Sequence, residues 1–577
     1  MPTSSPASEH QASLPVRDVL DLARRFRKLS ADPPRVARET PFGYAVGDTN
    51  AFHVLDLNAP RITPVSATVQ QVTDHAYFFV ENGVAFSDEA LATIASDFES
   101  LVYPSVTAAF GKEWTPGVDS DHRITLLHAN LRGAGGYFSL SDEYPMAVVP
   151  RSNEREMLYL DAGILQAPGV SYNALVGHEL QHLIHWSADP SEDSWVNEGL
   201  SQVAAEAVGA GGDWVDSFLD KPDTQLTFWP EIGDSAIHYA ASELFFSYLL
   251  DHYGGRENAK ELLAVQGNGI AGVDEYLKAY GKDFVDVFSD WIVANYADAA
   301  DGPFSHLNSE SRIQTFTTVD SAGEGEGDVG QFASDYIDVT DPLSGSTFFF
   351  DGAEEVGIGV PEHDGAFWWS GRGDGIDTKL TKAFDLRGLQ RATLRFDAWY
   401  EIEEGWDYGY VAVSVDSGAT WTAIPGRETT DYDPVEAAYG PGYTGESGGW
   451  VAEEVDLSAY AGRKVLVRFE YVSDDATSFT GLAVDNIELP ELQYGDDADG
   501  NSDWTPDGFT SVSGRLPQQF VIQLVAGERE NPTVSRIDLD AENRVEISLA
   551  GPAMIVVSGI VEGTAEPAGY RWELRAP

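Results

Sequence analysis

The fold of this chain is decided by the stretch Asn173-Ala-Leu-Val-Gly-His-Glu-Leu-Gln-His-Leu-Ile-His-Trp186. It contains no proline and has a wide apolar surface, and it is bracketed by Pro168-Gly169 on one side and Pro190 on the other. These signals predict a helix with defined ends. A helix that is apolar nearly all round but also carries three histidines and a glutamate would bury polar groups without partners, unless those groups bind something.

Two histidines in this helix have the spacing of metal ligands. His178 and His182 are four residues apart, which places both imidazoles on one helix face, as a zinc ion requires. Glu179 then lies beside the metal, where its carboxylate can accept a proton from a zinc-bound water. The motif predicts a zinc hydrolase site. The alternative is an ordinary core helix whose histidines are hydrogen-bonded.

A zinc ion in a hydrolase usually has three protein ligands and one open position. His185 lies one helical turn beyond His182 and is one candidate. In the metzincin pattern, position 185 would be glycine and the third ligand would be a histidine at position 188. Position 188 is Ala188, so that pattern does not apply. The better candidate is Glu198, on a second predicted helix over 194–206 that follows after a short connection. The alternatives are that Glu198 is an exposed helix carboxylate and that His185 is a packing residue.

The HExxH motif at 178–182, followed by Trp195-Val-Asn-Glu-Gly-Leu200, resembles the gluzincin class of zinc peptidases. The sequence around both motifs is most similar to the hyicolysin-like bacterial metallopeptidases. The resemblance implies that Glu198 completes the metal site. It also implies a downstream tyrosine or histidine that stabilises the oxyanion on the scissile carbonyl. Tyr239, on a predicted helix over 238–253, matches that residue, and His238 is the second candidate. The alternative is a structural tyrosine.

Two strands are predicted before the metal helix, over 123–130 and 156–161, with a glycine-rich loop over 133–138 between them. In zinc peptidases of this architecture, an extended substrate pairs its backbone with the sheet edge next to the first metal helix. We expect this edge at Met157–Asp161 or on the Gly135–Ser139 side of the preceding loop. A last helix is predicted over 284–296.

Length, charge and composition bound the remaining possibilities. A chain of 577 residues is expected to form about three or four domains. The absence of cysteine excludes disulfides, cysteine-ligated zinc and thiol catalysis. The net charge of −59, from 94 acidic and 35 basic residues, argues against binding to nucleic acid or to anionic membranes.

No apolar stretch is long enough for a transmembrane helix, and the first residues lack a signal-peptide pattern. We nevertheless expect a secreted or cell-surface protein of bacterial or archaeal type, without membrane insertion. It is expected to be a monomer that acts on a protein or peptide substrate.

The second half of the chain has the pattern of a β-sandwich. After a serine-, glycine- and acid-rich segment over 308–330, alternating segments over 392–400, 410–415 and 464–471 predict antiparallel strands. The stretches 368–374, 413–421 and 481–486 resemble the jelly-roll module of immune inhibitor A-type peptidases, and are also similar to MAM-like and carbohydrate-binding sandwiches.

Such modules commonly hold a structural Ca²⁺ near their first and last strands. On this resemblance, the candidate calcium ligands are Asp351, Glu354 and Asp485, because hard oxygen ligands suit calcium. The alternative is that these are turn-forming acids. The module can also contact glycans or cell-surface proteins.

The sequence thus predicts a multidomain chain with an α+β zincin-like metallopeptidase domain followed by antiparallel β-sandwich (jelly-roll) domains. The predicted boundaries are 1–35 for a leader and amphipathic helix, 36–307 for the peptidase, 308–330 for a linker, 331–490 for the jelly roll, and 491–577 for a C-terminal β domain or sandwich extension.

The predicted function is that of a zinc-dependent endopeptidase for extracellular proteins. Endopeptidase is preferred over aminopeptidase because no GxMEN-like motif precedes HExxH. Two alternatives remain: a catalytically inactive scaffold whose β-sandwich modules bind glycans or cell-surface proteins, and a zinc hydrolase that cleaves another acyl bond.

Overall fold

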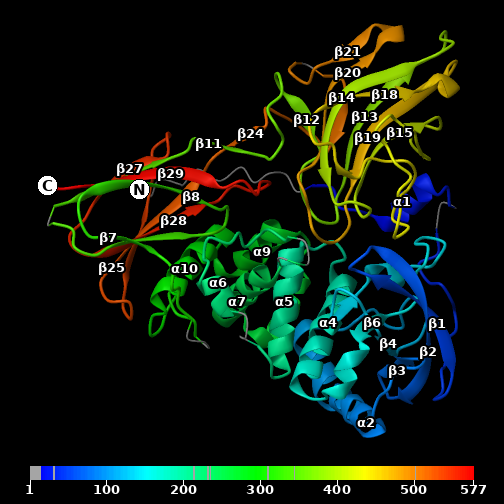
Figure 1. Cartoon of the computed structure of the whole chain (residues 1–577), viewed down its shortest axis with the longest axis horizontal. Coiled ribbons are helices and arrows are strands. Elements are labelled where there is room, and N and C mark those ends of the chain that lie inside the picture. The colour runs from blue at the N-terminus through cyan, green and yellow to red at the C-terminus, as the bar shows by residue number, and fades with distance from the viewer. Residues whose placement is uncertain are drawn as a thin grey trace.

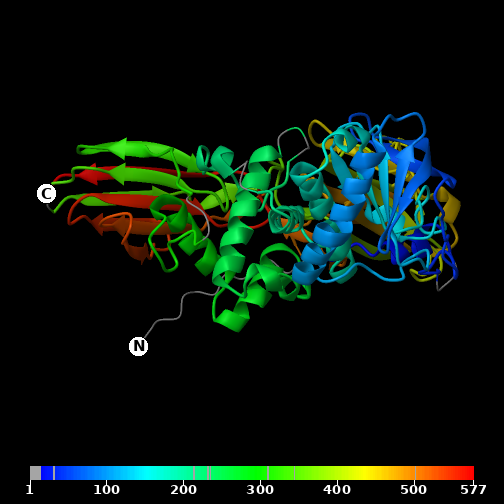
Figure 2. The same ribbon diagram turned by 90° about the horizontal axis from the view of Figure 1, so that it is seen from below.

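The chain folds into an α/β body and two β-sandwiches, shown from two sides in Figures 1 and 2. The computed structural model describes residues 14–29, 33–211, 215–230, 233, 235–307, 311–343, 345–500 and 502–577. The predicted leader therefore lies almost wholly outside the described residues.

The α/β body begins with a six-stranded sheet in the order β1-β2-β3-β4-β6-β5. The strands β3, β4 and β6 are parallel, and the others pair antiparallel. Every residue of β4 is buried, as expected for a strand covered on both faces. The strand bounds are β1 Thr49–Asp56, β2 Arg61–Val72, β3 Ala76–Glu81, β4 Ile124–Ala129, β5 Gly136–Phe138 and β6 Met157–Asp161.

Helices between and after its strands share one large apolar core with this sheet. The predicted metal helix is α4, Val170–Ala188, and the second predicted helix is α5, Ser194–Ala207. The predictions over 238–253 and 284–296 correspond to α7 and α10. The other bounds are α2 Asp88–Asp97, α3 Tyr103–Phe110, α6 Val215–Leu219, α7 Ala236–His252, α8 Lys260–Leu263, α9 Gly269–Leu277 and α10 Phe284–Ala297.

The middle sandwich pairs a seven-stranded sheet that contains β12, β14, β17, β18, β20, β21 and β23 with a five-stranded sheet in the order β16-β15-β19-β13-β22. Aromatic and branched side chains of both sheets form its core. The bounds are β12 Phe367–Trp369, β13 Asp377–Asp385, β14 Thr393–Ile402, β15 Tyr408–Ser414, β16 Thr422–Ala423, β17 Gly445–Glu446, β18 Val451–Asp456, β19 Lys464–Val472, β20 Gly481–Leu489, β21 Tyr494–Asp496, β22 Thr505–Asp507 and β23 Thr510–Val512.

The C-terminal sandwich combines strands from both ends of the second half of the chain. Its sheets have the orders β27-β10-β29-β8 and β26-β25-β28-β9-β7, and the short ribbon β11-β24 leads from it toward the middle sandwich. The bounds are β7 Thr317–Val319, β8 Gly323–Val329, β9 Asp335–Val339, β10 Thr347–Gly352, β11 Glu355–Gly357, β24 Arg515–Pro517, β25 Phe520–Ala526, β26 Thr533–Ile537, β27 Arg544–Ser548, β28 Ala553–Gly559 and β29 Ala568–Arg575.

These pairings differ from the predicted boundaries. Strands β9 and β10 belong with the C-terminal strands, whereas residues 494–512 complete the middle sandwich. The boundaries at 330/331 and 490/491 were wrong, because strands far apart in sequence pair across the middle module.

The acidic glycine-rich segment predicted as a linker contains the strand β8. Its glycines lie under aromatic rings of β29: a Cβ at Gly325 would be 2.5 Å from the Trp572 ring, and one at Gly327 would be 2.6 Å from the Tyr570 hydroxyl. The absence of side chains therefore permits close packing here, where composition alone indicated a loop.

The predicted amphipathic helix is α1, Val19–Phe26, and it lies between the middle sandwich and the α/β body (Figure 1). Leu22 and Phe26 pack on aromatic residues of the sandwich, while Val19 and Ala23 contact Trp186 and neighbours in the α/β body. This helix therefore packs against both the middle sandwich and the α/β body. Within the described ranges, each helix is too short or too polar to cross a bilayer.

Candidate metal centre

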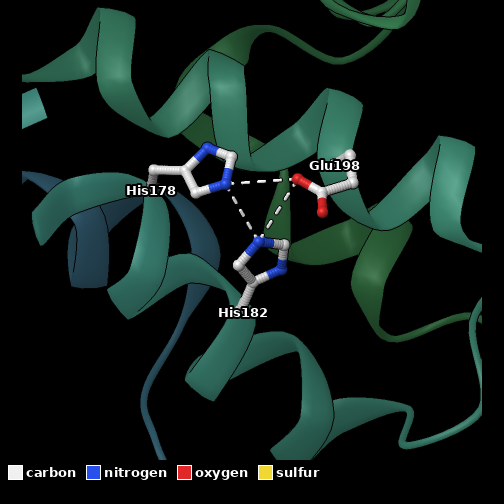
Figure 3. A group of neighbouring side chains, drawn as sticks. All are labelled: His178, His182 and Glu198. Atoms are coloured by element: carbon white, nitrogen blue, oxygen red, sulfur yellow. Dashed lines mark hydrogen bonds and ion pairs between the residues drawn. The ribbon is translucent and has the colours of Figure 1, made fainter. Parts of the chain in front are cut away.

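Three predicted ligands converge between α4 and α5 (Figure 3). The Nε2 atoms of His178 and His182 are 3.0 Å apart. The Oε2 atom of Glu198 lies 3.2 Å from the first nitrogen and 3.4 Å from the second. The three side chains are partly buried and present one donor atom each to the same point.

These distances fit a tetrahedral zinc ion. With zinc–ligand bonds of about 2.0–2.1 Å, tetrahedral geometry separates neighbouring donor atoms by roughly 3.3 Å, which is close to the three observed values. The Oε2 atom of Glu198 is buried and has no hydrogen-bond partner among the described residues. Two imidazoles and one carboxylate form a donor set that suits zinc in hydrolases.

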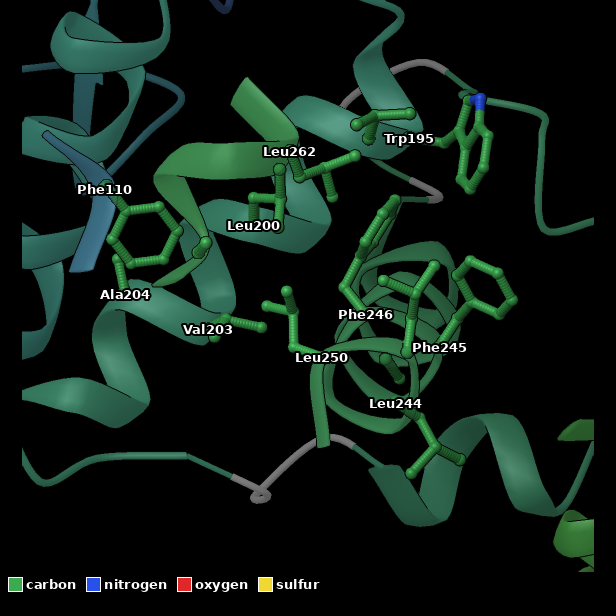
Figure 4. Close-up of a cluster of buried hydrophobic side chains, with 14 of the residues drawn as sticks. Phe110, Trp195, Leu200, Val203, Ala204, Leu244, Phe245, Phe246, Leu250 and Leu262 are labelled. Carbon is green, nitrogen blue, oxygen red and sulfur yellow. The ribbon is translucent and has the colours of Figure 1, made fainter. Parts of the chain in front are cut away.

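The local sequence explains how Glu198 reaches the histidines. The second turn of α5 carries it, a few residues after the short connection from α4. Behind it, Gly199 permits a very close approach of α5 to α7, because a Cβ there would be 2.5 Å from the Phe246 ring and 2.9 Å from Ser242 Cβ. Figure 4 shows the apolar cluster that joins the two helices, including Trp195, Leu200 and Phe246.

A second layer of side chains orients His182. Its Nδ1–H donates to Asn197 Oδ1 at 3.0 Å, and Ser201 Oγ lies 3.2 Å from the same nitrogen. This bond leaves the lone pair on Nε2, which faces the other ligands. Sequence reasoning missed Asn197 and Ser201, although both lie near Glu198 on the predicted helix.

His185 belongs to this supporting layer and not to the ligand group. It is buried, and its Nδ1 lies 3.3 Å from Gln181 Nε2. Burial lowers the pKa of His185 to about 3, so it stays neutral. The interpretation of His185 as a packing residue agrees with this placement.

Glu179 lies between the ligands and the edge of the sheet. Its side chain is buried, and burial raises its pKa despite the opposing effect of His178 and His182. The carboxylate accepts a hydrogen bond from the backbone of Phe138. A Cβ on Gly136 would be 3.1 Å from Glu179 Oε1, so β5 passes directly over this carboxylate.

The sheet edge beside the metal centre is β5. It pairs antiparallel with β6, with Tyr137 opposite Tyr159, and has no further neighbour on its outer side within the described sheet. Of the two predicted edges, Met157–Asp161 was wrong, because β6 lies between β4 and β5. The Gly135–Ser139 alternative matches β5.

The electrostatics of Glu198 and Tyr239 are linked. Burial alone would raise the pKa of Glu198, but the charges of His182 and His178 lower it well below its usual range. The Tyr239 hydroxyl hydrogen-bonds the Glu198 carboxylate, and burial raises the pKa of Tyr239. Tyr239 therefore stands at the centre as a neutral donor.

His238 does not reach this centre. Its Nδ1–H donates to the backbone oxygen of Gln225 at 3.2 Å, and its ring packs against Phe228 and Trp229. Because consecutive helix residues point in different directions, His238 and Tyr239 cannot both face the ligands. The second candidate for oxyanion stabilisation was therefore wrong.

The three predicted calcium ligands do not come together in the described structure. Asp351 is on β10 and accepts a hydrogen bond from Arg544 at 2.7 Å. Asp485 is on β20 in the other sandwich, 3.1 Å from His363. Glu354 follows β10, on the side of Asp351. The prediction of a single calcium site built from these three residues was wrong, because Asp351 and Asp485 belong to different sheets.

Sequence reasoning missed a second group with metal-binding geometry. Ligand atoms of Glu403, Asp407 and Asp474 lie within 4.8 Å of one another in the middle sandwich. A signal was available in the density of acids in Glu401-Ile-Glu-Glu-Gly-Trp-Asp407 and in Asp474-Asp475, but no local spacing joins the two stretches.

Residues 351–514 match the family described as immune inhibitor A-like, MAM domain. This range contains the whole middle sandwich, so the predicted likeness of that module is confirmed. The chain is 34% identical over 160 residues to the pre-pro-metalloprotease PrtV of Vibrio cholerae serotype O1 (strain M66-2). It is 31% identical over 152 residues to immune inhibitor A of Bacillus thuringiensis subsp. alesti.

A third relative is bacillopeptidase F of Bacillus subtilis (strain 168), with 30% identity over 102 residues. The three alignments cover 27%, 26% and 18% of this chain, and 17%, 21% and 6% of the relatives. The chain thus spans about a fifth or less of the proteins that it matches. Two of these three proteins are named for peptidase activity. The similarity to them concerns the middle sandwich. The likeness of the α/β body to hyicolysin-like enzymes stays a prediction.

Proposed function

We propose that the chain is a zinc-dependent endopeptidase. The observation that carries this proposal is the convergence of His178, His182 and Glu198 on one point, with Glu179 buried beside it. A bound zinc ion would act as a Lewis acid on the scissile carbonyl and lower the pKa of a coordinated water. The similarity of the middle sandwich to a part of a protein named metalloprotease supports the same conclusion.

Each residue around the ligands has a role in this proposal. Glu179 accepts the proton of the attacking water and returns it to the leaving amine, and its burial, which raises its pKa, strengthens it as a proton acceptor. Tyr239 donates a hydrogen bond toward the developing oxyanion. Asn197 holds the His182 imidazole in the tautomer that leaves Nε2 free.

The edge strand supports a peptide as the substrate. The exposed side of β5 offers backbone donors and acceptors to an extended chain, directly above Glu179. Internal cleavage is proposed because no GxMEN-like motif, an amine-anchoring signature of aminopeptidases, precedes HExxH. We further propose that the substrates are extracellular proteins; the name of the Vibrio relative, a pre-pro-metalloprotease, supports this setting.

The test compares wild type with Glu179→Gln. We expect wild type to bind one zinc ion at this centre and to cleave unfolded casein, with activity lost to a chelator and restored by zinc. Glu179→Gln should keep the zinc but lose activity by several orders of magnitude, because the proton acceptor is gone. The matched control is Glu275→Gln, an exposed carboxylate on α9 that pairs with Lys278.

Two results would contradict the proposal. Zinc-loaded wild type that leaves casein and short peptides intact would favour a non-peptidase hydrolase or an inactive scaffold. A Glu179→Gln variant with wild-type activity would remove the assigned mechanism.

A further inference from the structure

One turn of the middle sandwich contacts the α/β body beside the metal centre. The turn lies between β12 and β13 and carries Arg372 and Asp374. Asp374 Oδ2 accepts hydrogen bonds from the backbone N–H of Ser194 at 3.0 Å and from the Ser194 hydroxyl at 2.6 Å. Ser194 is the first residue of α5, about one helical turn before Glu198. These two bonds fix the turn against the helix that carries a predicted ligand.

Arg372, two residues before Asp374, reaches a second element of the α/β body. This element is the segment 222–230, which lies between α6 and α7. The guanidinium carbon of Arg372 lies over the Phe228 ring, 4.8 Å from its centroid. Nη2 of Arg372 donates to the backbone oxygen of Ser478 at 2.7 Å, which fixes the guanidinium within the sandwich. The electron-rich face of Phe228 is thus attracted to a cation that another domain holds in place.

The residue after Phe228 packs on the tyrosine of the metal centre. The rings of Trp229 and Tyr239 meet edge to face, with centroids 4.8 Å apart, and Trp229 is only 7% exposed. The Tyr239 ring in turn lies 6.1 Å from the ring of His178, and its hydroxyl reaches Glu198. Trp229 therefore supports the Tyr239 ring, while the ring and hydroxyl of Tyr239 contact the predicted ligands. Edge-to-face pairs of this kind fix the relative orientation of the two rings.

Other contacts hold the first half of the segment 222–230. The backbone N–H of Leu226 donates to the Phe332 oxygen at 3.0 Å, just before β9 of the C-terminal sandwich. The backbone oxygen of Gln225 accepts a hydrogen bond from His238 Nδ1–H at 3.2 Å. These bonds end two residues before Phe228. The contact with Arg372 therefore acts on the half of the segment that carries Trp229.

We propose that Arg372 and Trp229 are positioning residues for Tyr239. Arg372 holds Phe228, the backbone at Phe228 places Trp229, and Trp229 holds the Tyr239 ring so that its hydroxyl faces the metal centre. The middle sandwich thereby contributes to catalysis in the α/β body. The hydroxyl is at the far end of the side chain, so a small rotation of an unsupported ring displaces it from the oxyanion. This inference rests on the proposed function, which assigns Tyr239 as the oxyanion donor.

The first experiment measures the kinetics of the zinc-loaded full chain on casein peptides. Trp229→Ala should lower kcat by about 30-fold and Arg372→Met by about tenfold, with KM and zinc content nearly unchanged, because a misplaced donor weakens mainly the transition state. Arg372→Lys keeps a cation near the ring and should lose less than about threefold. The matched control is Arg575→Met, which removes a guanidinium 4.7 Å from the Phe349 ring in the C-terminal sandwich and should leave kcat unchanged.

Double variants distinguish positioning from general damage to the fold. In the Tyr239→Phe background the hydroxyl is already absent, so nothing remains for Arg372 and Trp229 to position. Adding Arg372→Met or Trp229→Ala there should cost less than about twofold more in kcat, because coupled residues are not additive. Full losses that multiply in this background would overturn the assignment.

The second experiment does not depend on activity. It measures amide hydrogen exchange in peptides that cover 222–230 and 235–243, with and without zinc. Arg372→Met should speed exchange in both peptides by about tenfold, because local opening becomes easier, whereas Arg575→Met should change neither.

The two experiments separate the possible failures. Wild-type exchange in Arg372→Met would overturn the contact between the domains, and faster exchange with wild-type kcat would overturn the link to Tyr239. If zinc-loaded wild type cleaves no peptide, the proposed function fails, and hydrogen exchange alone decides whether Arg372 holds the segment before Tyr239. Thermal melts check that each variant is folded, and Arg372→Gln replaces Arg372→Met if the latter is not.

Discussion

Replacing Gly199 with alanine should loosen the metal centre while the protein stays folded. Gly199 lies next to Glu198 and faces α7, where an added Cβ would be 2.5 Å from Phe246 Cδ2 and 3.0 Å from the Ser242 backbone oxygen. Ordinary contact begins at 3.4 Å. The start of α5 must therefore move from α7 by about 0.9 Å, and Glu198 moves with it.

Two effects on stability oppose each other in this variant. Alanine gains about 1 kcal/mol over glycine in helix propensity, whereas overpacking of a dense core costs about 1–3 kcal/mol. The net loss is thus at most about 2 kcal/mol, too small to unfold the domain. A zinc–oxygen bond does not tolerate a displacement of this size. Zinc affinity should fall on the order of 100-fold, at the upper end of the effect of losing a supporting residue.

The assay is a competition titration of zinc against a chromophoric chelator, together with a thermal melt. The matched control is Gly177→Ala on α4, next to the other ligand His178. Its Cβ would be 3.3 Å from Val208 Cγ2 and 3.4 Å from the Ala204 oxygen, so small adjustments suffice and zinc affinity should stay within about threefold of wild type. A folded Gly199→Ala variant with wild-type zinc affinity would refute the reasoning.

Two further variants test the surroundings of the centre, and a third tests the buried carboxyl pair of Glu143 and Glu156. Asn197→Ala should weaken zinc binding by about 10–100-fold in the same titration, because His182 loses the acceptor that orients it. Tyr239→Phe should lower kcat for casein peptides by about 100-fold at unchanged zinc content, since one oxyanion donor is removed; an unchanged kcat would make Tyr239 structural. Burial and the neighbouring carboxylates raise the pKa of Glu143 and, to about 8, that of Glu156. The folded state therefore keeps protons that the unfolded state releases above about pH 4.5, and stability falls as the pH rises from there through 8. Glu143→Gln should flatten this decline in thermal melts at pH 5 and pH 8, and an equally steep decline would contradict the assignment.

Much of the α/β body was predictable because its signals are local. The i, i+4 spacing of His178 and His182 determines that they share a helix face in any helix that contains them. The alternation of apolar residues likewise predicted β4 and β6, and the sandwich strands β14, β15 and β19. The placement of Glu198 on a second helix followed from the short connection after the first helix.

Other features depend on pairings that have no local signature. Strands β9 and β10 come shortly before the middle sandwich in the chain but pair with strands more than 190 residues later, such as β28 and β29. The predicted calcium ligands failed for the same reason, since strand pairing separated Asp351 from Asp485. The acidic stretch β8 looked like a linker because composition does not reveal the aromatic rings of β29 above its glycines.

By itself, the sequence determined the ligand-bearing helices and the chemistry of their side chains, because helix geometry depends on residues within a few positions of one another. Tertiary structure alone decided which sheet edge faces Glu179, which way His238 points, and that Asp374, 180 residues from Ser194 along the chain, caps the helix of Glu198. Contacts of this kind depend on how whole domains pack, and no short-range pattern of residues encodes them.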